Sequence, residues 1–272
     1  MVSTVSPNYA REIQTAEFGW GLEGHIQGHS HKLVGIVNGI DYDEWSPAVD
    51  PFIAKAYTAD DLTGKAACKA ALQKQFNLPV RPEVPLIGFV GRLAEQKGID
   101  LLAHVVGGLM HLDLQIVLLG TGEPWAEHFF SDVAARYSEK FACFIGYNNA
   151  VAHQIEAGSD FFLMPSLFEP CGLNQIYSLS YGTLPIVRAT GGLDDTIENY
   201  NPHSGEGTGF KFWDATGDAL YGTVKWAVDT WYENPEQIET MKKRAMHQHF
   251  GWEESARDYE KLYYYALGKR RG

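Results

Sequence analysis

The stretch PLIGFVGRLAEQKGIDLLAHVVGGLMHLDLQIVLLG, residues 85–120, contains a complete strand–helix–strand unit. Its two apolar runs, PLIGFVG (85–91) and LQIVLLG (114–120), have the length of short buried strands. Between them, residues 98–112 have a helix-like pattern. Two buried strands joined by a helix run parallel in one sheet, so this unit predicts a parallel α/β fold.

The same alternation continues for about 70 more residues. Helix-like segments precede three further apolar runs, KFACFIG (140–146), DFFLMPS (160–166) and TLPIVRA (183–189). Five strands alternating with helices predict a Rossmann-like, doubly wound parallel sheet covered on both faces. Ligands of such sheets bind at the carboxyl ends of the strands, so the residues that follow each run are the candidates for function.

The regions on either side of these units differ in pattern. Residues 1–45 hold scattered Gly and His with one apolar run, LVGIV, and are interpreted as the end of another domain plus a hinge. Residues 46–84, with a helix-like LTGKAACKAALQKQF, are interpreted as a connector. The Rossmann-like domain is predicted over 85–250, helical from Asp214 onward, and a terminal helix with a basic tail over 251–272.

Composition narrows the classes of partner. The 272 residues carry 22 Lys and Arg against 34 Asp and Glu, a net charge of -12, which repels nucleic acid phosphates and anionic membrane surfaces. Three widely spaced cysteines, Cys68, Cys143 and Cys171, form no metal or disulfide pattern. No apolar run reaches the ~20 residues of a membrane span. These features predict a soluble cytoplasmic protein, with a plastid as the alternative for a plant sequence.

Charged and ring-bearing residues follow the predicted strands. Arg92 and Lys97 follow the first strand and can grip one anion near a helix start, or lie as solvated loop charges. Tyr147 follows the third strand as a possible base-stacking ring or a rim residue. Glu169, in SLFEPCGL, follows the fourth strand as a working carboxylate or a cap of the next helix. ATGGLDDT follows the fifth and exposes backbone N–H groups suited to phosphate.

Several motifs together resemble a known enzyme family. FVGRLAEQKGIDLL, LMPSLFEPCGLNQIYSLSYGTLPIVRATGGLDDTI, KLVGIVNGIDYDEWSP and STVSPNYAREIQT are similar to the carboxyl-terminal part of bacterial glycogen synthases and plant starch synthases, glycosyltransferase family 5. The resemblance runs from Ser3 to the last helix. It implies the GT-B architecture of two Rossmann-like domains, with this chain holding the nucleotide-sugar domain and a remnant of the amino-terminal domain.

The resemblance also implies an activity and its partners. Glucose is expected to pass from ADP-glucose to the non-reducing end of an α-1,4-glucan with retention, without a cofactor or metal. The family's amino-terminal KTGGL motif is absent from this sequence. The chain alone is therefore expected to need the missing amino-terminal domain as a partner, and a non-catalytic nucleotide-sugar or glucan binding module is the alternative function.

Site roles carry over onto matching positions. Arg92 and Lys97 match the pair that holds the donor diphosphate, and Glu169 matches the catalytic-site Glu beside the donor glucose. The remaining positions match residues that line the donor site, namely the adenine-side ring Tyr147, the pocket residues Cys171, Gly172 and Leu173, and the phosphate-facing Thr190, Gly191 and Gly192. Many retaining GT-B enzymes carry a second Glu where this chain has Tyr177, which leaves ribose binding unassigned.

Competing interpretations are weaker. A dinucleotide dehydrogenase needs G-x-G-x-x-G after its first strand, which GFVGRL lacks, and GTGEP after the second strand is interpreted as a turn. The DYD at 41–43 and the HSH and HQH triplets at 29–31 and 247–249 lack the further ligands of a metal site. Cys171 has no visible base beside it, so we expect an inert pocket thiol.

Overall fold

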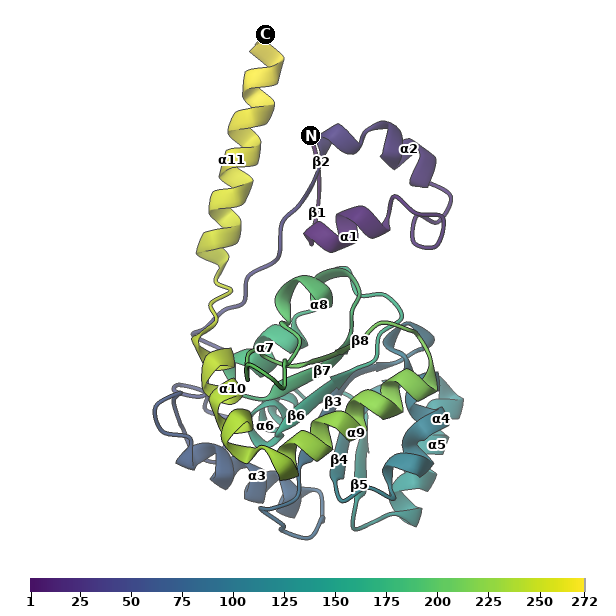
Figure 1. Cartoon of the computed structure of the whole chain (residues 1–272), viewed down its shortest axis with the longest axis vertical. Helices are drawn as coiled ribbons and strands as arrows, with labels where there is room; N and C mark the ends of the chain where they lie inside the picture. The colour runs from purple at the N-terminus through teal and green to yellow at the C-terminus, as the bar shows by residue number, and fades with distance from the viewer. Residues whose placement is uncertain (272) are drawn as a thin grey trace.

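The computed structural model describes residues 1–271, and a six-stranded parallel sheet forms its centre (Figure 1). The strands are β3 (Leu86–Leu93), β4 (Gln115–Gly122), β5 (Phe141–Ile145), β6 (Phe161–Met164), β7 (Leu184–Arg188) and β8 (Phe210–Phe212). The five strands expected from apolar runs are confirmed. β8 was missed because its three residues, FKF, are too short to form an apolar run.

The strand order is β5-β4-β3-β6-β7-β8, so the chain reverses its direction across the sheet after β5. Right-handed crossovers then place helices of the two halves on opposite faces. The helices that follow the strands are α4 (Ile99–Leu109), α5 (Pro124–Arg136), α6 (Asn149–Gly158), α7 (Asn174–Ser180) and α8 (Gly191–Thr196). The reversal makes the carboxyl ends of β3 and β6 the topological switch point, where such sheets bind ligands.

Burial confirms that both faces of the sheet are covered. Ile116, Val117 and Leu118 are consecutive in β4, so their side chains alternate between the faces, yet none has any exposed surface. α4 packs beside α5 and α9 (Gly217–Glu233), whereas α3 (Thr63–Gln75) packs beside α6. The segment expected as a connector therefore contributes α3 as part of the helical cover.

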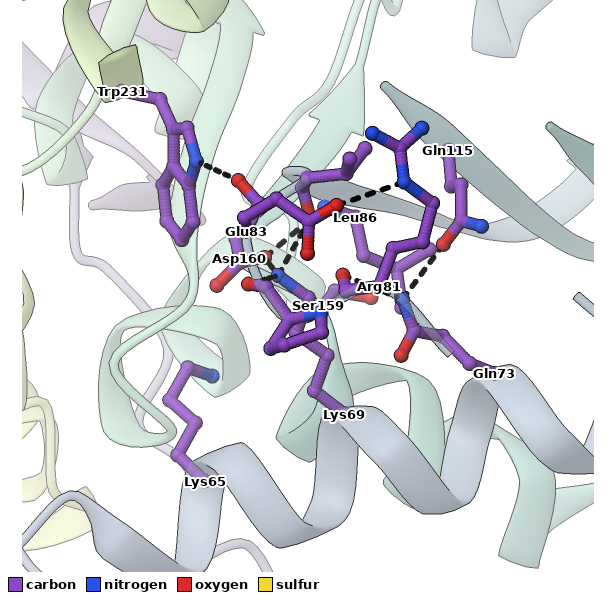
Figure 2. A network of polar contacts seen from close by, with 12 residues as sticks. Lys65, Lys69, Gln73, Arg81, Glu83, Leu86, Gln115, Ser159, Asp160 and Trp231 are labelled. Atoms are coloured by element: carbon purple, nitrogen blue, oxygen red, sulfur yellow. Dashed lines mark hydrogen bonds and ion pairs between the residues drawn. The ribbon is translucent and has the colours of Figure 1, made fainter. Parts of the chain in front are cut away.

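A buried ionic network joins the helices to the amino ends of the strands (Figure 2). Asp160, just before β6, accepts from Lys69 Nζ of α3 at 2.7 Å and from the Leu86 N–H at 3.0 Å. Lys242 of α10 (Pro235–His247) lies 3.3 Å from its other oxygen. Burial alone would raise the pKa of Asp160, but the two ammonium charges and the hydrogen bonds from Lys69 and Leu86 together outweigh burial and lower that pKa. The network fixes α3 and α10 to the sheet at the edge opposite the switch point.

The first 35 residues form a small separate sheet. β1 (Val2–Thr4) and β2 (Leu33–Gly35) pair in parallel, and α1 (Pro7–Glu12), α2 (Glu23–Gly28) and the 3-10 helix η1 (Ser30–Lys32) lie between them in sequence. Of this region only the LVGIV run stands out in the sequence, because three-residue strands give no usable period. The domain limits at residues 45, 84 and 250 stay a prediction.

The last helix, α11 (Trp252–Arg271), extends away from the main sheet and past the β1–β2 pair (Figure 1). It exposes Tyr263, Tyr264 and Tyr265. Helix continues through most of the expected basic tail, whose final residue, Gly272, lies outside the described residues. Within residues 1–271, no helix combines the length and apolar character needed to cross a membrane.

Candidate functional site

An ion pair lies at the topological switch point. Lys97 ends the 3-10 helix η2 (Glu95–Lys97) after β3, and Glu169 lies in the loop after β6. The Lys97 Nζ to Glu169 Oε2 distance is 2.5 Å, and the Ser166 hydroxyl donates to the same oxygen at 3.2 Å. Glu169 is buried, whereas the Lys97 side chain is 23% exposed. The structure thus joins two of the three residues that the sequence predicted as catalytic.

Close backbone contact between the two loops makes this pairing possible. The Leu167 N–H donates to the Gln96 carbonyl at 2.9 Å. Gly98 adopts a left-handed φ of 69°, and a Cβ there would lie 2.0 Å from the Pro165 carbonyl oxygen. Only glycine fits such an approach with this backbone. The glycine at the start of α4 therefore lets the loop of Lys97 approach the loop of Glu169.

A small cavity of about 50 Å³ lies beside the pair. Its wall includes both charged side chains together with Gly172, Leu173 and Asn174. Asn174, the first residue of α7, donates from its side chain to the Val90 carbonyl at 2.9 Å and so fixes that helix against β3. Asn174 and Ser166 were not singled out from the sequence, because a lone polar residue beside a motif carries no pattern of its own.

Arg92 projects from the end of β3 and is exposed. Its guanidinium donates to Gln96 Oε1 at 2.8 Å, which holds it over the loop that carries Lys97. Among the described residues Arg92 forms no ion pair with a carboxylate. Its charge is therefore available to an anion arriving at the switch point.

Glu169 does not act as a helix cap. The N-cap position of α7 is Leu173, and no side chain accepts a hydrogen bond from the first turn of that helix. The alternative of a capping Glu is wrong for this structure, since the side chain turns toward Lys97 instead. Cys171 is buried, and burial raises the pKa of its thiol, which opposes a nucleophilic role at neutral pH.

The turn at Thr190, Gly191 and Gly192 packs directly on the loop of Glu169. The Gly192 N–H donates to the Glu169 carbonyl at 3.0 Å. A Cβ on Gly191 would lie 2.0 Å from the Glu169 carbonyl oxygen, and one on Gly192 would lie 2.0 Å from that of Cys171. The two glycines are thus explained by close backbone packing, a reason that sequence analysis missed.

The donors of this turn bind groups within the chain. Glu12 Oε1, on α1, accepts from the Gly191 N–H at 2.8 Å and from the Thr190 hydroxyl at 3.0 Å. The sequence predicted that these donors face a phosphate. In the structure Thr190 and Gly191 donate to a carboxylate from the amino-terminal segment, a contact that nothing in the sequence near Glu12 indicated, and the phosphate-facing role stays a prediction.

The two tyrosines singled out from the sequence have different surroundings. Tyr147, just after β5, is 83% exposed, so its ring is free to stack on a ligand. Tyr177 stacks on Trp45 with a ring-centroid distance of 3.8 Å, and burial raises its pKa to about 12. Tyr177 therefore fixes the segment before α3 to the sheet domain and is not among the residues lining the cavity.

The candidate metal motifs show no cluster of ligands. Within residues 1–271 no group of three or more His, Cys, Asp or Glu side chains is placed to hold an ion. In the DYD triplet, Asp41 Oδ1 accepts from the Asp43 N–H at 2.9 Å, an interaction that shapes a local turn. In the HQH triplet, His249 stacks on Tyr42.

The doubly wound parallel sheet places Arg92, Lys97 and Glu169 at its switch point, where sheets of this class bind their ligands. The chain belongs to the glycosyl transferases group 1 family, whose family model matches residues 72–248. A second family model, the starch synthase catalytic domain, matches residues 1–28. The family resemblance stated from the sequence motifs is confirmed.

Curated relatives carry the same similarity over the whole chain. Glycogen synthase 1 of Geobacter sulfurreducens is 56% identical over 272 residues, which are 100% of this chain and 54% of that protein. Soluble starch synthase 1 of Oryza sativa subsp. japonica is 46% identical over 269 residues, 98% of this chain and 42% of that protein. The chain thus spans about half the length of the curated relatives it matches.

Solved structures share the fold. The catalytic domain of starch synthase IV from Arabidopsis thaliana, bound to ADP and acarbose, aligns with a TM-score of 0.92 at 37% identity, covering 98% of this chain and 56% of that one. A glycosyltransferase from Rickettsia africae aligns with a TM-score of 0.68 at 19% identity, covering 98% and 63% of the two chains. The GT-B expectation for the fold is confirmed by the starch synthase match.

Proposed function

We propose that this chain is the donor-binding part of a retaining glucosyltransferase that moves glucose from ADP-glucose to the non-reducing end of an α-1,4-glucan. The observation that carries the proposal is the Lys97–Glu169 pair at the switch point. The pair lies in a chain that is 46–56% identical to enzymes named glycogen and starch synthases. The reaction belongs to glycogen or starch synthesis, and we place it in the cytoplasm.

In this proposal Arg92 and Lys97 hold the donor diphosphate. Two cations beside the leaving group stabilise the negative charge that develops as the glucosyl bond breaks, and they do so without a metal. Support comes from the exposed guanidinium of Arg92 at the end of β3 and the partly exposed ammonium of Lys97 in η2, which follows that strand. The exposed ring of Tyr147 is assigned to the adenine.

Glu169 is assigned to the glucose. A buried carboxylate held by Lys97 and Ser166 keeps one geometry, and a carboxylate in fixed position can accept a hydrogen bond from a sugar hydroxyl and orient the ring for attack. Gly172 and Leu173 line the same cavity and are assigned to the donor sugar and phosphate, with Cys171 next to them in the loop. The turn 190–192 supports this loop from behind.

The acceptor glucan is assigned to a cleft between this chain and a second domain, which the relatives carry in the half of their length that this chain does not cover. Closure of a two-domain cleft excludes water and aligns the reactants, and such positioning can be worth effective molarities of about 10⁵ to 10⁸ M. The 272-residue chain by itself is therefore proposed to bind ADP and to transfer essentially no glucose. The exposed aromatic side chains of α11 are available to the partner domain.

Radiolabelled ADP-glucose with a glycogen primer tests the proposal. We compare the chain alone with the chain joined to the first half of the Geobacter sulfurreducens enzyme, and calorimetry measures ADP binding to both. The expected result is ADP binding by both proteins and glucose incorporation only by the joined one. Binding without transfer by the joined protein would identify a non-catalytic module, and absence of ADP binding would reject a donor site.

A further inference from the structure

Two short helices from distant parts of the chain cap each other. Ser6 and Asn8, at the start of α1, donate from the Ser6 hydroxyl at 2.5 Å and the Asn8 N–H at 2.9 Å to Asp195 Oδ2 on α8. In return, Glu12 at the end of α1 accepts from the turn that begins α8. Each helix thus supplies a carboxylate to the first turn of the other, and α1 and α8 pack side by side.

The carboxylate of Glu12 is held from more than one side. Its Oε1 accepts from three donors, the side-chain amide of Asn8 at 3.1 Å on the same helix, and the Thr190 hydroxyl and the Gly191 N–H, 178 and 179 residues away in the chain. Arg188, at the end of β7, is buried and donates to the Leu167 carbonyl at 2.9 Å. Burial lowers the pKa of Arg188, and the nearby charges of Glu12 and Glu17 act against that shift. A buried cation therefore attracts Glu12 toward the strand end that precedes the turn.

The turn that Glu12 holds is also the support of the site carboxylate. The Gly192 N–H donates to the Glu169 carbonyl, and the backbone of Gly191 leaves no space for a Cβ against the same carbonyl. The position of the turn thus sets the position of the Glu169 backbone, and Glu169 in turn binds Lys97. A continuous path of contacts runs from the amino-terminal segment to the ion pair.

We propose that Glu12 and Asp195 form a reciprocal clasp, and that Glu12 is a positioning residue which holds Glu169 in place through the turn 190–192. The clasp joins the amino-terminal segment to the sheet domain by four hydrogen bonds that end on carboxylates. Hydrogen bonds to charged groups are stronger than those between neutral groups, so a few of them suffice to hold a short helix. The effect of Glu12 on donor binding, through the position of Glu169, rests on the proposed function.

Amide hydrogen exchange, followed by NMR on the 272-residue chain, tests the clasp without any ligand. Glu12→Ala should speed exchange about fivefold at the backbone amides of Gly192 and Asn8, which donate to the Glu169 carbonyl and to Asp195, because loss of one contact loosens both helices. Asp195→Asn should speed exchange at Gly191 by a similar factor. Glu17→Gln is the matched control, since Glu17 lies near the same guanidinium and is exposed, and it should change none of the three amides.

Exchange that quickens only at Gly191 in Glu12→Ala and only at Asn8 in Asp195→Asn would overturn the clasp, because the contacts would then be independent. Should Glu12→Ala fail to fold, Glu12→Gln removes the charge and retains the size. Exchange rates at the same amides then test the clasp.

The positioning role has its own readout. Calorimetry gives the ratio of ADP-glucose to ADP affinity, which isolates the glucose contacts. Glu12→Ala should lower that ratio about fivefold with ADP affinity unchanged, the size of a lost hydrogen bond. An unchanged ratio overturns the positioning role. If the unsubstituted chain binds neither nucleotide, the proposed function fails, while the exchange rates still decide the clasp.

Discussion

Lys97 and Glu169 lie 72 residues apart in the chain and meet at 2.5 Å, Nζ to Oε2, at the point where the sheet order reverses. The pairing means that the group predicted to bind diphosphate and the group predicted to bind sugar are neighbours before any donor arrives. Substitution of either side chain therefore changes the surroundings of the other. Their roles can be separated, because ADP affinity reports on the nucleotide site and glucose transfer reports on the sugar site.

Replacement of either cation should weaken ADP binding. Arg92→Ala and Lys97→Ala are each expected to cost about 1–3 kcal/mol of binding free energy, the scale of a charge-assisted hydrogen bond. Calorimetry on the 272-residue chain measures the change. Lys225→Ala is the control, because Lys225 pairs with Asp229 on exposed helix surface. Unchanged ADP affinity in both site variants would remove these residues from the diphosphate site.

Glu169→Gln should act on the sugar and not on the nucleotide. We expect ADP affinity to stay nearly unchanged and glucose transfer by the joined two-half protein to fall strongly, because a neutral amide no longer supplies a charged acceptor. Glu139→Gln, on the exposed surface, is the matched control. Collapse of ADP affinity with turnover per bound donor preserved would show that Glu169 is structural.

Tyr147→Ala should weaken ADP binding with stability unaffected. The ring is 83% exposed, so its loss removes little buried surface from the fold. Stacking on a base is worth about 1–3 kcal/mol in proteins that bind single-stranded nucleic acid, and a loss of that order is expected here. Tyr147→Phe keeps the ring and should bind normally. Equal ADP affinity of the Ala and unsubstituted chains would place the adenine elsewhere.

Gly98→Ala should destabilise the fold and disturb the ion pair. The added Cβ meets the Pro165 carbonyl oxygen at 2.0 Å on a backbone with φ of 69°. Left-handed backbone alone costs about 1–2 kcal/mol for a residue with a Cβ. Gly107→Ala is the matched control on the same helix, where the methyl meets no atom within 4 Å and stabilises by about 0.5–1 kcal/mol. Urea unfolding compares the two, and equal stabilities would contradict the close approach.

Stability should depend on pH through two buried groups, Glu156 on α6 and Lys65 on α3. Burial raises the pKa of Glu156 from 4.5 to about 8, so the folded chain keeps a proton that the unfolded chain releases, and stability falls as pH rises from about 4.5 to 8. Burial, helped by the charge of Lys242, lowers the pKa of Lys65 from 10.5 to about 7, so stability falls as pH falls from about 10.5 to 7.

Each group contributes a slope of at most about 1.4 kcal/mol per pH unit, the value for one proton. Glu156→Gln should remove the fall in the free energy of unfolding between pH 5 and 7. Lys65→Met should remove the rise in that free energy between pH 8 and 10. Lys74→Met, exposed on the same helix as Lys65, is the control. Urea unfolding across pH measures the slopes, and a slope retained in Glu156→Gln between pH 5 and 7 would refute the buried neutral acid.

The apolar runs at 85–91, 114–120, 140–146, 160–166 and 183–189 were sufficient to identify β3 to β7 and their parallel arrangement. Strands buried on both faces consist of nearly continuous apolar residues, which is a local property of the chain. β1, β2 and β8 have three residues each and were not predicted as strands, although β2 lies in the LVGIV run, since their pairing depends on neighbours and not on their own composition.

The fold class, the family and the loops that carry charge were predictable from the sequence, because they depend on short patterns. Which of those charges meet depends on how distant segments pack in the folded chain. Three contacts join residues from distant segments: the ion pair of Glu169 with Lys97, the hydrogen bond from Gly191 to Glu12 and the stacking of Tyr177 on Trp45. No local preference encodes such contacts, since they form only when the sheet order and the close approach of glycine backbones bring the segments together.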